Sequence, residues 1–194
     1  MSPEAISAAA ASAGVIAAIW LQIAEWKRSR FARGIDAISA LDARFDGPEL
    51  REVRRRAAAY FLDPKPDDVE GTEAAQHLMN FFETLGFLYE KQVIDDESVW
   101  HFFASWILPY YRESQALRTE IAKDDPNVYS SFRKVYDAVR KCEERRHASR
   151  QSVHILADDA VRAFLVEEAA LATKSLPHTT PQLGSSGTPP NPTI

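Results

Sequence analysis

Residues 72–92 read TEAAQHLMNFFETLGFLYEKQ, and this mostly apolar stretch predicts one central helix. Successive residues of a helix are turned by about 100°, so positions three and four apart share a face. One broad apolar face holds Leu78, Phe81, Phe82, Leu85, Leu88 and Tyr89. A second holds Met79, Gly86 and Phe87, with Glu83 between the two. A helix that is apolar around most of its circumference must be buried from two sides, so other helices should pack around it.

The composition is that of an all-α domain with appendages. A chain of 194 residues, 45% of them hydrophobic, has the size of one ordinary domain plus extensions. It has only seven glycines and no sustained alternation of polar and apolar residues, which leaves little room for strands. The net charge of -5 gives no reason to expect a nucleic acid partner. The single cysteine, Cys142, excludes an intramolecular disulfide.

Residues 5–24 contain no charged residue and predict a transmembrane helix. Roughly 20 residues at a rise of ~1.5 Å each span the ~30 Å hydrocarbon layer of a membrane. Glu4 precedes the stretch, and a basic cluster follows it, made of Lys27, Arg28, Arg30 and Arg33. By the positive-inside rule the amino terminus should face outward and the bulk of the chain should be cytoplasmic. A cleaved signal peptide is disfavoured, because its positive charge would precede the apolar core.

Residues 5–24 also allow a second interpretation. An alanine-rich helix of this kind suits a soluble protein in which it packs on the rest of the bundle or on a second copy. The spacing of Ala10, Gly14 and Ala18 would let two such helices approach closely, which makes a homo-oligomer one alternative.

The rest of the chain predicts a bundle of about five to six helices within residues 35–174. Besides the central helix, the expected segments are 35–45, 48–62, one from about residue 97, one from Asp125–Pro126, and 153–173. Residues 1–34 are expected to form the membrane anchor and the basic segment that follows it. Residues 175–194 are expected to be a disordered tail, because they are rich in Pro, Ser, Thr and Gly.

Several residues predict where these helices begin or bend. Thr72 is the expected N-cap of the central helix, after a loop over residues 63–71, and Asp95 or Asp96 caps the next helix. Pro109 should kink or break that helix, because proline lacks the backbone donor and clashes with the preceding turn. Asp125 followed by Pro126 is typical of an N-cap and first helical residue.

Two charged residues lie beside predicted core stripes. The arginines of segment 48–62 either form a solvated basic face near an anionic membrane surface, or Arg54 reaches into the core to meet a carboxylate. Glu83 has Met79, Gly86 and Phe87 as its helical neighbours, so it should be at least half buried. A buried carboxylate must be paired, hydrogen-bonded or protonated.

Glu83 has five candidate partners, namely Arg54, the hydroxyls of Tyr110 or Tyr111, the indole N–H of Trp106, and Arg112. The expected role is a structural pair that fixes the register of the helices. Glu83, Arg54, Trp106 and Tyr110 are therefore the candidate binding residues. No catalytic residue is assigned, since no second carboxylate or histidine is placed to work with Glu83. The five histidines have no partner at i+4, and we predict neither a metal site nor a cofactor.

An ordered set of features resembles a known family. A membrane-length N-terminal helix with a basic exit is followed by NFFETLG at residues 80–86, and then by an aromatic helix with Trp106 and Tyr110–Tyr111. Over roughly residues 5–141 this set is similar to a bacterial family of single-pass helical proteins classed only as a domain of unknown function. The resemblance implies an all-helical cytoplasmic domain and bacterial origin, hence the inner membrane. It implies no reaction, ligand or catalytic residue.

These observations favour a membrane-tethered interaction module. It would contact lipid through residues 5–24 and hold its bundle in the cytoplasm for an unidentified protein partner. The alternative is an enzyme or small-ligand receptor whose pocket is lined by Trp100, Phe103, Trp106, Tyr110 and Glu83. A third hypothesis is a membrane-disrupting effector that self-associates through Gly14.

Overall fold

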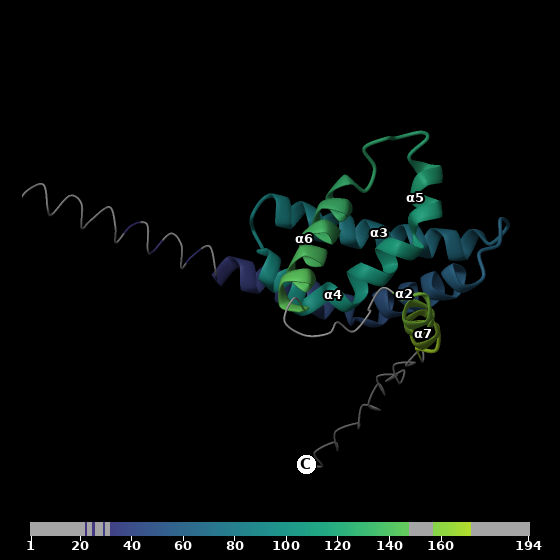
Figure 1. Ribbon diagram of the computed structural model, residues 1–194, viewed down its shortest axis with the longest axis horizontal. Coiled ribbons are helices and arrows are strands. Elements are labelled where there is room, and N and C mark those ends of the chain that lie inside the picture. The colour runs from purple at the N-terminus through teal and green to yellow at the C-terminus, as the bar shows by residue number, and fades with distance from the viewer. Residues whose placement is uncertain (1–21, 23–24, 26–28, 30–31, 148–156, 172–194) are drawn as a thin grey trace, which may run out of the picture.

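The computed structural model describes residues 22, 25, 29, 32–147 and 157–171, which are helical apart from turns and short connections (Figure 1). A first helix covers residues 32–45. It is followed by α2 (Pro48–Leu62), α3 (Val69–Glu90), α4 (Asp96–Glu113), α5 (Gln115–Ile121), α6 (Ser130–His147) and α7 (Asp158–Ala169). The predicted all-α fold is confirmed for this part of the chain. The short helix α5 is one helix more than the sequence predicted.

Helix α3 is the centre of the bundle and contacts both α2 and α6. Helix α4 packs on α6, and α7 packs on α2 (Figure 1). The buried residues of α3 are Gly71, Ala74, Ala75, Leu78, Met79, Phe81, Phe82, Leu85 and Gly86. Among the residues of the two predicted faces, burial is confirmed for Leu78, Met79, Phe81, Phe82, Leu85 and Gly86, and Leu88 and Tyr89 are partly buried. The prediction is wrong for Phe87, which is 50% exposed.

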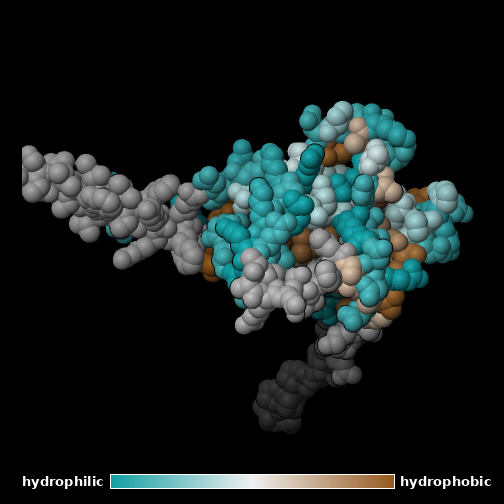
Figure 2. Space-filling model, in the orientation of Figure 1, coloured by the Kyte–Doolittle hydropathy of each residue, from teal (hydrophilic) through white to brown (hydrophobic). Residues whose placement is uncertain are grey.

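Aromatic side chains fill the space around Phe45, at the end of the first helix. Its ring centroid lies 5.0 Å from that of Phe81, 5.6 Å from that of Phe103 and 5.2 Å from that of Trp106. Ring pairs of this kind contribute about 0.5–1.5 kcal/mol each beyond the burial of their area. The aromatic stripe of α4 therefore packs into the core. On the outer face seen in Figure 2, hydrophilic residues predominate, and a hydrophobic group shows where Figure 1 places α7.

Two predicted helix caps are wrong. Helix α3 begins at Val69, and its N-cap is Asp68, whose carboxylate accepts a hydrogen bond of 2.9 Å from the amide of Gly71. Thr72 lies inside the first turn and donates its hydroxyl to the carbonyl of Asp68. Helix α6 begins at Ser130 rather than at Asp125, because residues 126–129 form turns. Asp95 does cap α4, as one of two alternatives predicted, by accepting from the amide of Ser98.

Pro109 does not break α4, which continues to Glu113. The proline removes the hydrogen bond that the carbonyl of Ser105, four residues earlier, would otherwise accept. Ser105 is exposed, whereas Pro109 itself is buried. Packing of the flanking residues Leu108 and Tyr110, both buried, then holds the helix together.

The predicted transmembrane helix at residues 5–24 lies outside the described residues, apart from Gln22. Among the helices that the structure does describe, none is long and apolar enough to cross a membrane. The predicted tail at residues 175–194 also lies outside the described part, as do residues 153–156 and 172–173 of the last predicted helix. The membrane anchor and the tail remain predictions.

Candidate functional site

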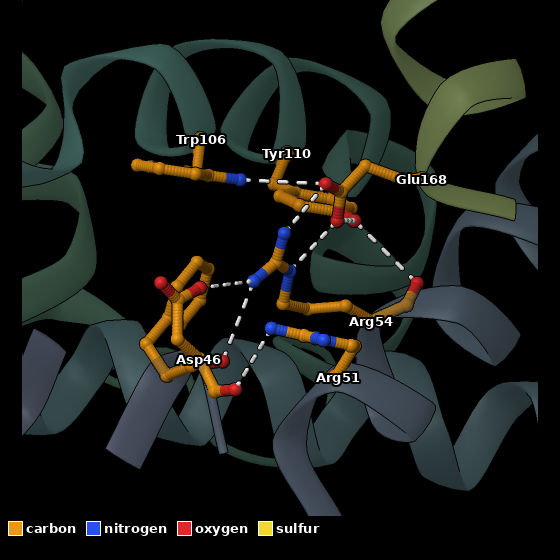
Figure 3. A network of polar contacts seen from close by, with 7 residues as sticks. Asp46, Arg51, Arg54, Trp106, Tyr110 and Glu168 are labelled. Atoms are coloured by element: carbon orange, nitrogen blue, oxygen red, sulfur yellow. Dashed lines mark hydrogen bonds and ion pairs between the residues drawn. The ribbon is translucent and has the colours of Figure 1, made fainter. Parts of the chain in front are cut away.

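Arg54 is the centre of a buried polar cluster. It lies on α2 between Leu50 and Ala57, both core residues, so its helix directs it inward, and only 4% of it is exposed. Its Nε donates to Oε2 of Glu168 at 2.7 Å, and its Nη2 donates to Oε1 at 2.6 Å (Figure 3). Two parallel hydrogen bonds between a guanidinium and a carboxylate are stronger and more directional than a single contact. The predicted inward turn of Arg54 towards a carboxylate is confirmed.

Glu168 reaches this cluster from α7 and is 6% exposed. Besides Arg54, its carboxylate accepts hydrogen bonds from the hydroxyl of Tyr110 at 3.0 Å and from the indole N–H of Trp106 at 3.4 Å. Both donors belong to α4, whereas Arg54 belongs to α2. The carboxylate on α7 therefore joins α2 and α4, as the dashed lines from Arg54, Trp106 and Tyr110 show (Figure 3).

The remaining donor of Arg54 faces the end of the first helix. Its Nη1 donates to Oδ1 of Asp46 at 3.2 Å and to the backbone carbonyl of Phe45 at 3.3 Å. The guanidinium also lies 4.3 Å from the ring centroid of Phe45 and 5.4 Å from that of Trp106. Aromatic faces attract a cation through their quadrupole. The positive charge of Arg54 is thus compensated by carboxylates and rings.

Burial and charge together fix the protonation of Arg54 and Tyr110. Burial lowers the pKa of Arg54, but the hydrogen bonds and negative charge of Glu168 outweigh it, so the pKa is raised above its ordinary value. Burial, followed by the charge of Glu168 and the hydrogen bond to it, raises the pKa of Tyr110 well above 10. Tyr110 therefore stays a neutral donor, and Arg54 stays a cation, throughout the physiological pH range.

Three of the four candidate binding residues come together, but the fourth does not. Arg54, Trp106 and Tyr110 converge on Glu168, so the partnership predicted between them and Glu83 is wrong. Glu83 instead accepts hydrogen bonds from backbone amides of α6, at 3.2 Å from Ser131 and at 2.7 Å from Phe132. The other two predicted partners are also engaged elsewhere: Tyr111 stacks on Tyr136, and Arg112 pairs with Asp158.

The sequence contains a signal for Glu168 that the stripe predicted for residues 153–173 leaves out. The predicted stripe of that helix included Val161 and Phe164. Glu168 follows them by seven and four residues, which places it on the same face of a helix. Leu165, also missed, completes this face, and the structure buries Val161, Leu165 and Glu168 together.

Two surface hollows lie away from the pocket that the sequence predicted. One of about 840 Å³ lies between α3, α4 and α6 and is lined by Tyr89 and by charged residues that include Asp96, Lys141 and Arg145. A second of about 290 Å³ lies where α7 meets α2 and α4, lined by Phe61 and Leu165 among others. Neither is lined by the predicted pocket residues. Among the residues that the structure covers, no group of three or more His, Cys, Asp or Glu could hold a metal ion.

In its described part, the protein is an all-α bundle with a buried arginine–carboxylate cluster between three helices. Residues 8–139 match the family described as Domain of unknown function (DUF4760), and the chain belongs to this family. The matched region agrees with the resemblance drawn from the sequence over roughly residues 5–141. No curated protein and no solved structure matches the chain. Arg54, Trp106 and Tyr110 lie within the matched region, whereas α7 and its Glu168 lie beyond it.

Proposed function

We propose that this protein is a membrane-tethered interaction module that recognises helices. The observation that carries the proposal is the placement of α7, which brings an acidic residue from outside the family region into a buried site within it. A helix laid on a groove and anchored by apolar and charged side chains is a recurring mode of protein recognition. We propose no reaction for the protein.

The proposed tether is the uncharged stretch at residues 5–24, with its basic flank on the carboxyl side. The family match begins at residue 8, so it includes most of this stretch as well as the bundle. A single anchor of this kind would keep the bundle and its helix-binding site in the cytoplasm, at the inner membrane of a bacterium.

The tether predicts a defined topology that cysteine labelling can test. In a Cys142→Ala background, Ser2→Cys should react with a membrane-impermeant maleimide on intact spheroplasts, because the amino terminus faces outward. The matched variant Ser186→Cys should react only after permeabilisation. Recovery of the full chain entirely in the soluble fraction without detergent would contradict the tether, and so would the reverse labelling pattern.

A further inference from the structure

We infer that the surface now covered by α7 is a docking site for an acidic amphipathic helix of another protein, and that α7 is its competitor in cis. The inference rests on the proposed function and specifies its partner. We use "α7 seat" for the residues that hold α7 on α2 and α4, namely Arg54, Phe61, Trp106, Tyr110 and Arg112.

Helix α7 has the pattern of a helix bound in a groove. Val161 and Leu165 are each 2% exposed, and the ring of Phe164 lies 5.2 Å from that of Tyr110 in edge-to-face contact. With Glu168 they occupy positions i, i+3, i+4 and i+7, which is the spacing of anchors on one face of a docked helix. The opposite face is exposed, including Val166 at 52%.

The charges of α7 and of its seat are complementary at both ends. Asp158, at the first turn of α7, pairs with Arg112 of α4. Glu168, ten residues further on, pairs with the buried Arg54 of α2. Complementary charges at two ends of an interface set the direction and register of a bound helix. A partner helix of the same length and charge order fits the seat in only one orientation.

Several features suit α7 to release. It has 12 residues, a length at which an isolated helix is marginal in water. An open hollow of about 290 Å³, lined by Phe61, Arg112, Asp158 and Leu165 among others, lies at the edge of its contact with the seat. Its position beyond residue 139 leaves the seat itself within the family region. We therefore expect the seat to accept a helix with an apolar residue at i, i+3 and i+4 and a glutamate at i+7.

A labelled peptide tests this competition. The probe is a fluorescent synthetic peptide of residues 157–171, ADDAVRAFLVEEAAL, added to the full chain in lipid nanodiscs and followed by anisotropy. In the wild-type chain, α7 competes at a high effective concentration, so the peptide should bind weakly. Glu168→Gln in the chain should loosen α7 and tighten peptide binding by about tenfold or more, because it removes one partner of a buried ion pair. The exposed neighbour supplies the matched control, and Glu167→Gln should bind the peptide as the wild type does.

A second chain variant and a second peptide keep the result interpretable. Val161→Asp in the chain should also release α7, since a buried apolar anchor becomes charged, and should tighten peptide binding while Arg54 and Glu168 are intact. A peptide with Gln at the position of Glu168 should bind every chain more weakly than the parent peptide. Adding Arg54→Met to the Glu168→Gln chain should remove the increase in peptide affinity that Glu168→Gln produces.

Two outcomes would overturn the inference. Peptide binding that is equal in the wild type and in both opened variants, with helical content unchanged, would make α7 a fixed part of the core. A stable dimer of the opened variants would assign the seat to α7 of a second copy rather than to another protein. Neither outcome depends on the labelling of Ser2→Cys and Ser186→Cys. The membrane tether and the docking site are therefore tested by separate experiments.

Discussion

Glu83 accepts hydrogen bonds from backbone amides in the first turn of α6, of which Ser131 lies 48 residues further along the chain. Helix α6 begins at Ser130, so Ser131 and Phe132 are its second and third residues. Their amides, which donate to Glu83, normally donate hydrogen bonds to the side chain of the N-cap residue. Tyr129 precedes the helix with φ of 58°, and its side chain has no carboxylate to offer. Glu83 therefore acts as the cap of α6 from α3, and it fixes the register between the two helices.

Loss of this contact should cost the stability of an N-cap. We expect Glu83→Ala to lower the free energy of unfolding by about 1 kcal/mol, in line with measured cap deletions. Glu83→Gln keeps an acceptor oxygen and should lose less. Chemical denaturation followed by circular dichroism measures both, with the exposed Glu73→Ala on the same helix as control. An unchanged unfolding midpoint in Glu83→Ala would show that the two amides find another acceptor.

Gly86 lies one turn beyond Glu83 and serves the same helix junction. A Cβ atom at this position would lie 2.2 Å from the backbone oxygen of Ser131, which is backbone and unable to move aside like a flexible side chain. Glycine is needed here because α3 and α6 approach so closely, and not for an unusual backbone conformation. Glu83 and Gly86 are thus two parts of one contact, and the apolar pattern of α3 alone does not reveal it.

At the scale of the helix, α2 combines a buried arginine with a surface group of charges. Glu52 accepts hydrogen bonds of 2.8 and 2.7 Å from Arg55 and of 2.7 Å from Arg56. The hydrogen bonds from Arg55 and then Arg56 lower the pKa of Glu52 from 4.5 to about 2. Of the four arginines predicted to form a solvated basic face, Arg56 is exposed, Arg51 and Arg55 are partly exposed, and Arg54 belongs to the core.

The lowered pKa of Glu52 predicts a pH dependence of stability. A carboxyl group whose pKa is lower in the folded state stabilises it above the unfolded value of 4.5, and this contribution is lost as the pH falls towards about 2. We expect Glu52→Gln to be less stable than the wild type at pH 7 and to converge with it near pH 2. Urea unfolding at several pH values gives the comparison, with the exposed Glu49→Gln as control. Parallel curves for wild type and Glu52→Gln would contradict it.

The helices could be predicted where their boundaries depend on local sequence. Segment 48–62 coincides with α2, because Pro48 suits a first turn and Leu50 and Ala57 set the core spacing. The prediction is wrong where a distant residue sets the start of a helix. Helix α6 is an example, because its amides are capped by Glu83 of α3 and not by Asp125. In the candidate site, the angle of Arg54 indicated an inward side chain. Its partner depended on which helix lies opposite, and the sequence alone does not contain that information.

At the scale of the whole molecule, α7 is attached at the side of the bundle and not at its centre. Its principal contact is with α2, while α3 is enclosed by α2 and α6. Proteins open locally in units with few buried contacts before they unfold globally. The bundle of α2, α3, α4 and α6 and the docked helix α7 are expected to be two such units.

Hydrogen exchange should separate these two units. We expect the amides of α7 to exchange through local opening, well before those of α3, and Glu168→Gln to speed exchange in α7 with little change in α3. Mass spectrometry of peptides covering residues 158–169 and 69–90 gives both rates. Identical protection of α7 and α3, changing together in the variant, would mean that the molecule opens as one cooperative unit.

The distance along the chain between Arg54 and Glu168, 114 residues, also has a consequence during synthesis. At about 5–20 residues per second, a ribosome adds Glu168 roughly 6–23 s after Arg54. Helices α2, α3 and α4 can fold within that interval, because elementary folding steps are far faster. Each newly made molecule therefore passes through a period in which Arg54 has no carboxylate from its own C-terminal helix. A partner present at the time of translation would meet the site before its internal competitor exists.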